Sequence, residues 1–167
     1  PSYLVLFFDQ IYNFSYFQNG IILAMYYIGN GLISPFTGRL IDKTKRKGLL
    51  MGLGLLALDL AFMLLIIPFP PNFALFGIST IIFFVGVFST IYHPVGSMLL
   101  NYYYKEKSGS ALGINGIGGS TGRAIFPLLI AILAGLTGTK TYGIFILTFI
   151  ILFPAIFIYC DLRNIIV

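Results

Sequence analysis

A short basic turn between two long apolar runs constrains the fold of this chain more than any other feature. Residues 38–50 read GRLIDKTKRKGLL and hold five of the ten Lys and Arg residues, but only one of the five acidic residues. The runs on either side are almost free of charge. A basic turn of this kind is typical of a cytoplasmic connection between two membrane-spanning helices.

The composition indicates a protein whose outer surface faces lipid. The chain is 58% hydrophobic and 9% charged, whereas an average soluble domain has roughly 25% charged residues. The net charge of +5 is concentrated at the predicted helix ends, so it indicates orientation and contact with a lipid surface rather than nucleic-acid binding. We therefore expect an all-α membrane protein with a single helical-bundle domain over residues 1–167.

The apolar runs predict one partial span and five complete spans. The first run, residues 1–8, would reach only about 12 Å as a helix, which is too short for a hydrocarbon core of about 30 Å. We therefore expect it to be the second half of a spanning helix in a truncated chain. The complete spans are predicted at residues 18–40, 48–67, 74–104, 109–136 and 142–160.

The basic residues of the predicted loops are distributed unevenly between the two sides of the membrane. Cytoplasmic loops of membrane proteins carry the excess of Lys and Arg. This rule predicts a multi-pass protein of the cell membrane, with the loops at residues 41–48 and 104–109 in the cytoplasm. One side collects Lys43, Lys45, Arg46, Lys47, Lys105, Lys107 and Arg163, and the other collects Lys140 alone.

Polar residues also divide the spans into two groups. The spans at 18–40, 74–104 and 109–136 each carry a small or polar face, whereas those at 48–67 and 142–160 are apolar almost throughout. We expect the first group to line a wet cavity and the second to face lipid. Close helix packing is an alternative explanation for the glycines. It explains less well the polar and ionisable residues at membrane depth, which are His93, Asn101, Asn115 and Arg123.

Arg123 is the strongest candidate for a binding residue. It lies fourteen residues beyond Gly109, or roughly 20 Å along a helix, which places it deep in the hydrocarbon core. Its guanidinium stays charged there and offers a planar fork suited to carboxylate or phosphate. We expect it to bind an anionic group of a small solute, or alternatively to be tied permanently to Asp59 or to helix carbonyls. The other expected site residues are His93, as a second contact or proton carrier, with Asn115, Ser120 and Ser97.

Asp59 stands alone in an otherwise apolar span. An ionised carboxylate facing lipid would cost on the order of 2.5–3.5 kcal/mol. Asp59 should therefore face the bundle, be protonated, or pair with a cation, for which Arg123 is the candidate. Proton coupling and a structural ion pair are the two roles that this pattern leaves open.

The basic turn resembles the signature loop of the major facilitator superfamily, which joins the second and third helices and reads roughly G-x-L-a-D-r-x-G-r-k-x-x-l. Lys45 stands in place of the second glycine of that pattern. The step from Tyr92 through His93 to Pro94, followed by a glycine-rich span, resembles the fosmidomycin-resistance-like efflux branch. The matching loop positions are Gly38, Leu40, Asp42, Lys43, Arg46, Lys47 and Leu50, and the similar helix-five motif has Gly118, Gly122 and Pro127.

This resemblance implies half of helix 1 plus helices 2–6, the amino-terminal half of a twelve-span secondary transporter. Such a protein moves a small solute by alternating access, with a site at the midplane between two halves. The second six-helix half would come from the same gene or from a second copy. The resemblance also implies that Asp42 and its basic neighbours form a latch between the halves. The alternative is that these residues only set the orientation.

Two other classes remain open at this point. A non-transporting membrane scaffold or assembly subunit could dimerise through the glycine faces of its helices. A membrane enzyme is less favoured, because the sequence has no set of His, Asp or Glu residues at metal-binding or acid–base spacing. We therefore predict no catalytic residue, no metal and no cofactor. The expected partners are the lipid bilayer, a small solute, a proton as candidate coupling ion, and the second half.

Overall fold

In the computed structural model, the described residues are 8, 11–137, 152–153 and 155–161, and they contain helices and no strand. The all-α fold class is therefore confirmed. Three stretches within these residues are long and apolar enough to cross a membrane, Tyr16–Lys43, Lys47–Leu64 and Pro71–Leu133. The elements are α2 (Tyr16–Lys43), α3 (Lys47–Leu64), α4 (Pro71–Tyr104), the 3₁₀ turn η1 (Lys105–Lys107) and α5 (Ser108–Thr137).

The helix ends follow from local capping chemistry. At the start of α2, the Ser15 hydroxyl accepts a hydrogen bond from the Gln18 amide at 3.3 Å, and the Gln18 side chain accepts one from the Ser15 amide at 2.9 Å. This reciprocal arrangement satisfies two amides that the first helical turn leaves free. Pro71 occupies the first turn of α4, where a missing amide costs nothing. Most of the predicted spans at 1–8 and 142–160 lie outside the described residues.

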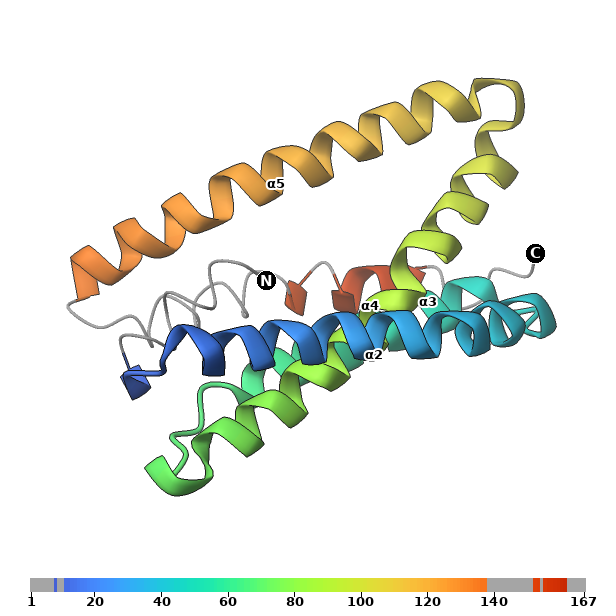
Figure 1. Ribbon diagram of the computed structural model, residues 1–167. Helices are drawn as coiled ribbons and strands as arrows, with labels where there is room; N and C mark the ends of the chain where they lie inside the picture. The colour runs from blue at the N-terminus through green and yellow to red at the C-terminus, as the bar shows by residue number, and fades with distance from the viewer. Residues whose placement is uncertain (1–7, 9–10, 138–151, 154, 162–167) are drawn as a thin grey trace.

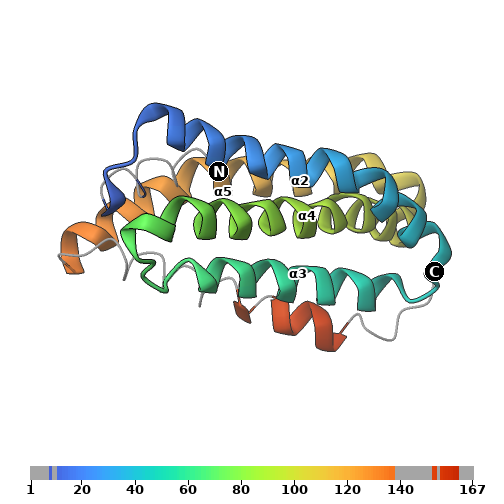
Figure 2. The ribbon, with the colours of Figure 1, turned by 60° about the horizontal axis from the view of Figure 1, so that its bottom comes forward.

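α4 is the central helix of the described bundle. It packs against α2 on one side and α3 on the other, while α2 and α3 make little contact with each other (Figures 1 and 2). α5 leaves η1 and runs back beside the bundle, touching α4 much less extensively (Figure 1). Two clusters of apolar side chains form the contacts of α4 with α2 and α3. One includes Ile22, Ala74 and Ile78, and the other includes Ile41, Met51 and Val95.

The crossing of α2 and α4 brings their backbones into contact. A Cβ atom added to Gly86 would meet the carbonyl oxygen of Tyr26 and would lie 3.0 Å from the Asn30 amide nitrogen. A Cβ atom added to Gly29 would likewise meet the Phe83 carbonyl oxygen. Each helix therefore needs glycine where the other passes, as in other closely packed membrane helices.

Polar side chains hold this crossing together on the carboxyl-terminal side of the two glycines. The side-chain amide of Asn30 donates to the Ser89 hydroxyl at 2.9 Å and more weakly to the Gly86 carbonyl at 3.4 Å. The Thr37 and Thr90 hydroxyls are 2.8 Å apart and buried. The polar face of the span at 74–104 was expected to line a cavity, but three of its residues, Gly86, Ser89 and Thr90, pack α4 against α2. A cavity-lining face and a helix-packing face show the same spacing of small residues, so the sequence pattern could not distinguish between the two.

α3 is also more enclosed than expected. It lies between α4 and the helical residues 155–161 (Figure 2). A Cβ atom on Gly54 would approach the Ile91 side chain of α4 at 2.9 Å, and one on Gly52 would approach the Tyr159 Cα atom at 2.7 Å. The expectation of a simply lipid-facing helix was therefore wrong for these two faces of α3. Gly52 and Gly54 leave room for Tyr159 and for Ile91, so α3 can pack closely on both of these faces.

Candidate functional site

The expected solute-site residues lie on two helices. α4 carries His93, which is exposed, and Ser97, which is half-buried. α5 carries Asn115, Ser120 and Arg123, which are all exposed. One hydrogen bond links the two helices in this region, from the Tyr92 hydroxyl to the Asn115 side-chain oxygen at 3.5 Å. The structure therefore places Asn115 of α5 beside Tyr92 of α4.

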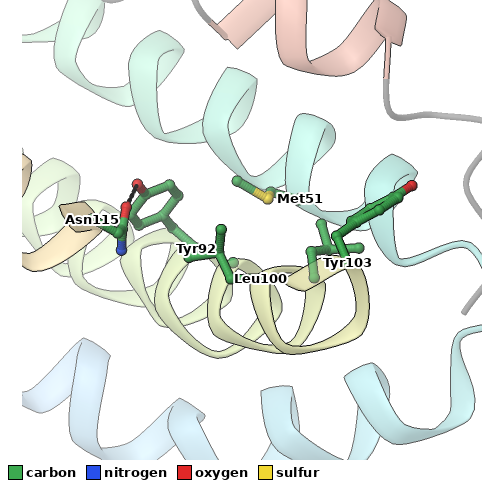
Figure 3. Close-up of a pocket in the computed structure, with 7 residues that line it drawn as sticks. Met51, Tyr92, Leu100, Tyr103 and Asn115 are labelled. Carbon is green, nitrogen blue, oxygen red and sulfur yellow. Dashed lines mark hydrogen bonds between the residues drawn. The ribbon is translucent and has the colours of Figure 1, made fainter. Parts of the chain in front are cut away.

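A pocket of about 210 Å³ lies where α3, α4 and α5 meet. Figure 3 shows the Tyr92–Asn115 hydrogen bond at one end and Tyr103 at the other, with Met51 across from them on α3. Of the five residues expected at the solute site, this pocket includes Asn115. Sequence reasoning missed Met51 and Tyr103, because they look like ordinary residues of an apolar span. The residues that line the pocket are Met51, Tyr92, Gly96, Leu99, Leu100, Tyr103 and Asn115.

Arg123 lies eight residues beyond Asn115 on α5, or about 12 Å along the helix. A Cβ atom added to Gly119 would have no atom within 4 Å, and one added to Gly122 would meet only Phe126 of the same helix, at 3.7 Å. The guanidinium is therefore accessible beside open space. An accessible guanidinium can donate paired hydrogen bonds to a planar anion without first losing a partner among the described residues.

Asp59 occupies the opposite kind of environment. Its side chain is 1% exposed, and neither carboxylate oxygen has a hydrogen-bond partner within the described part of the chain. It lies two helical turns from Gly52, on the face of α3 that meets Tyr159. Burial agrees with the expectation that Asp59 faces the bundle. The proposed pairing with Arg123 is not formed in this arrangement, where the arginine is exposed on α5.

The signature loop divides its residues between surface and interior. Asp42, Lys43 and Arg46 are exposed, whereas Lys47 is buried and its ammonium donates to the Ile41 carbonyl oxygen. That carbonyl lies in the last turn of α2, where a cation adds a donor to a carbonyl without an intrahelical partner and complements the helix dipole. Lys47 was expected to belong to the latch between the two halves, as one of the basic neighbours of Asp42. It caps α2 instead.

Thr44 strengthens the same turn. Its amide donates to the Leu40 carbonyl at 3.0 Å and the Ile41 carbonyl at 3.2 Å, and its hydroxyl donates to Leu40 at 2.7 Å. These bonds close a tight turn although Lys45 stands in place of a glycine. Gly38 has open space around its Cβ position.

In the helix-five motif on α5, Gly118 and Pro127 are exposed and Gly122 is half-buried. An added Cβ atom on Gly118 would have no neighbour within 4 Å, and Pro127 lies inside the continuous helix. The small residues on this face are therefore available for contacts other than those with α4.

Comparison with known proteins gives a family and one curated relative. The family model described as Major Facilitator Superfamily matches residues 1–163. The uncharacterized MFS-type transporter YfnC of Bacillus subtilis (strain 168) is 31% identical over 125 residues, which cover 75% of this chain and 29% of the relative. The chain therefore spans less than a third of the length of that relative. No solved structure gives a significant match.

Proposed function

This chain belongs to the major facilitator superfamily, and we propose that it is the amino-terminal part of a secondary transporter that moves a small solute by alternating access. The observation that carries the proposal is the family match over residues 1–163 together with a basic signature turn between two spanning helices. The missing second half belongs to the same gene product or to a second copy. The match to less than a third of the curated relative supports a longer complete protein.

A transport assay on the complete gene product tests this proposal. The protein is reconstituted in liposomes preloaded with unlabelled anionic and neutral solutes, and counterflow of the labelled forms is measured. A transporter is expected to accumulate at least one labelled solute transiently. Folded protein that exchanges none across a broad panel would instead support the scaffold alternative. That alternative draws on the open glycines of α2, since Gly31 and Gly38 have no atom within 4 Å of an added Cβ.

We assign the basic turns at residues 41–48 and 104–109 to the cytoplasm, in the cell membrane. In a Cys160→Ser background, single cysteines at Lys45 and Asn72 should react with an impermeant thiol reagent from opposite sides. The physical reason is that α3 separates the two loops by one crossing. Labelling of both positions from the same side would contradict the assignment.

Asp59 is proposed to bind the coupling proton. A buried carboxylate without hydrogen-bond partners is costly when ionised, so it is held as the neutral acid until a conformational change exposes it. Asp59→Asn keeps the shape and removes the proton. We expect folded protein with solute counterflow within about twofold of wild type and with proton-driven accumulation abolished.

Asp59→Glu serves as the matched variant, because it keeps an ionisable group and should retain part of the accumulation. A structural role would give a different pattern. It would lower the amount of folded protein in Asp59→Asn and would reduce counterflow and accumulation together.

Asp42 is proposed to act in a latch between the two halves. Its exposure leaves the carboxylate free to meet a partner helix amino terminus. Asp42→Asn should reduce transport by the complete protein several-fold, with membrane insertion unchanged because the basic residues remain. Transport is normalised to the protein present in the membrane. Lys47→Gln is the comparison, since it removes a buried cap and should lower stability rather than disturb the latch.

A further inference from the structure

The pocket between α3, α4 and α5 is elongated along α4. Tyr92 and Tyr103 mark its two ends (Figure 3), and eleven residues separate them, or about 16 Å of helix. Between them the lining is aliphatic, with Leu99 and Leu100 on α4 and Met51 on α3. In a bilayer the helices and the lipid chains run in nearly the same direction. The pocket therefore has the direction and the chemistry of a site for one acyl chain.

Tyr92 and Asn115 form a polar pair at the end of the pocket farther from η1. The Tyr92 hydroxyl donates to the Asn115 side-chain oxygen at 3.5 Å, a long hydrogen bond. The opposite end reaches Tyr103, whose side chain is 54% exposed. Tyrosine is enriched where a membrane protein meets the headgroup region. The polar end of a bound amphiphile would therefore lie beside Tyr103.

Two exposed cations follow two and four residues after Tyr103. η1 contains Lys105 and Lys107, both exposed, with one exposed acid, Glu106, between them. Within the described residues, the loop at the other end of α4, residues 65–70, has no charged residue. Positive charge therefore coincides with the headgroup end of the pocket, which favours an anionic headgroup over a zwitterionic one.

We propose that this chain binds one anionic phospholipid, with an acyl chain in the pocket between α3, α4 and α5 and the phosphate beside Lys105 and Lys107. The site is separate from Arg123 and does not depend on transport. Its ligand belongs to the leaflet at the basic end of the bundle. Lys47 takes no part, because its ammonium is buried on the Ile41 carbonyl.

The headgroup assignment is tested with the full chain in a non-ionic detergent, freed of native lipid. Dioleoyl phosphatidylglycerol and dioleoyl phosphatidylcholine are titrated separately, and bound lipid is counted by native mass spectrometry. Each cation near an anionic headgroup favours binding by about fivefold. Because Glu106 offsets one of the two cations, we expect phosphatidylglycerol to bind about fivefold tighter at low salt, and less so at 0.5 M salt because exposed charges are screened.

Charge variants locate the phosphate. Lys105→Gln with Lys107→Gln should abolish the preference for phosphatidylglycerol, because Glu106 is then the remaining charge of η1. Glu106→Gln should increase the preference. Lys47→Gln removes the same charge from a buried position and should leave the preference unchanged. Equal binding of both lipids by the wild-type chain would overturn the headgroup assignment. An effect of Lys47→Gln as large as that of the Lys105→Gln, Lys107→Gln double variant would also overturn it.

The chain assignment has its own test. A Cβ atom on Gly96 would meet only the Met51 methyl group at 3.9 Å, so this position has room for a side chain. Gly96→Leu should fill the pocket and weaken both lipids about tenfold while their ratio stays the same. Leu100→Phe fills the same space from an existing side chain and should act alike if Gly96→Leu does not fold. Unchanged affinity in a folded filling variant would overturn the pocket assignment.

Discussion

Gly86→Ala is expected to destabilise the bundle by about 1–3 kcal/mol, the usual cost of overpacking a tight contact. The added methyl group would meet the Tyr26 carbonyl oxygen, and a backbone atom cannot rotate away as a flexible side chain can. α2 and α4 would have to separate, which would also weaken the Asn30–Ser89 hydrogen bond. Gly86→Leu should prevent folding altogether.

The matched control is Gly31→Ala on α2. No atom lies within 4 Å of a Cβ at that position, so the stability should stay within about 1 kcal/mol of wild type, the size of the glycine-to-alanine propensity difference. Unfolding of the full chain in mixed detergent and SDS micelles, followed by far-UV circular dichroism, measures both variants. Equal stability of Gly86→Ala and Gly31→Ala would show that the two helices do not meet at Gly86.

Arg123→Gln is expected to lower the apparent affinity of the complete transporter for an anionic solute by about 10- to 150-fold, the range for losing one charged hydrogen-bonding partner. Arg123→Lys keeps the charge but loses the planar fork. It should therefore fold normally and give an intermediate loss. The measurement is the concentration dependence of counterflow, normalised to folded protein in the liposomes.

Arg39→Lys provides the comparison for this change. Arg39 is an exposed arginine of α2, and the same substitution there should leave the solute affinity unaltered. The anion-binding proposal fails if Arg123→Lys transports with wild-type affinity. It also fails if Arg123→Gln loses folded protein instead of affinity, because the arginine would then have a structural role.

The helices and the basic turn could be predicted from the sequence because both depend on local properties. Apolar length defines a span, and the cluster around Lys45 defines a turn, whatever the neighbours are. The helix contacts could not be predicted in the same way. Gly86 and Gly119 look equivalent in a glycine-containing span, yet one touches another backbone and the other has open space.

The same difficulty applies to the charged residues of the candidate sites. Lys43 and Lys47 look alike in the signature loop, and only the direction of the first turn of α3 makes Lys47 bury its ammonium. For Asp59, the cost of charge in lipid left three outcomes open, and a position facing the bundle was one of them. Its neighbours depend on which helices pack beside α3, and no local pattern encodes that choice.

The central position of α4 has a consequence for biosynthesis. α2 and α3 each pack on α4 and make little contact with each other, so neither can reach its final place until α4 has been made. The ribosome completes α4 sixty-one residues after α2 ends, which takes roughly 3–12 s at 5–20 residues per second. During that interval Asn30 and Thr37 have no partner helix. Nascent chains released after residue 70 should therefore be degraded much faster than chains released after residue 107, as a pulse-chase experiment would measure.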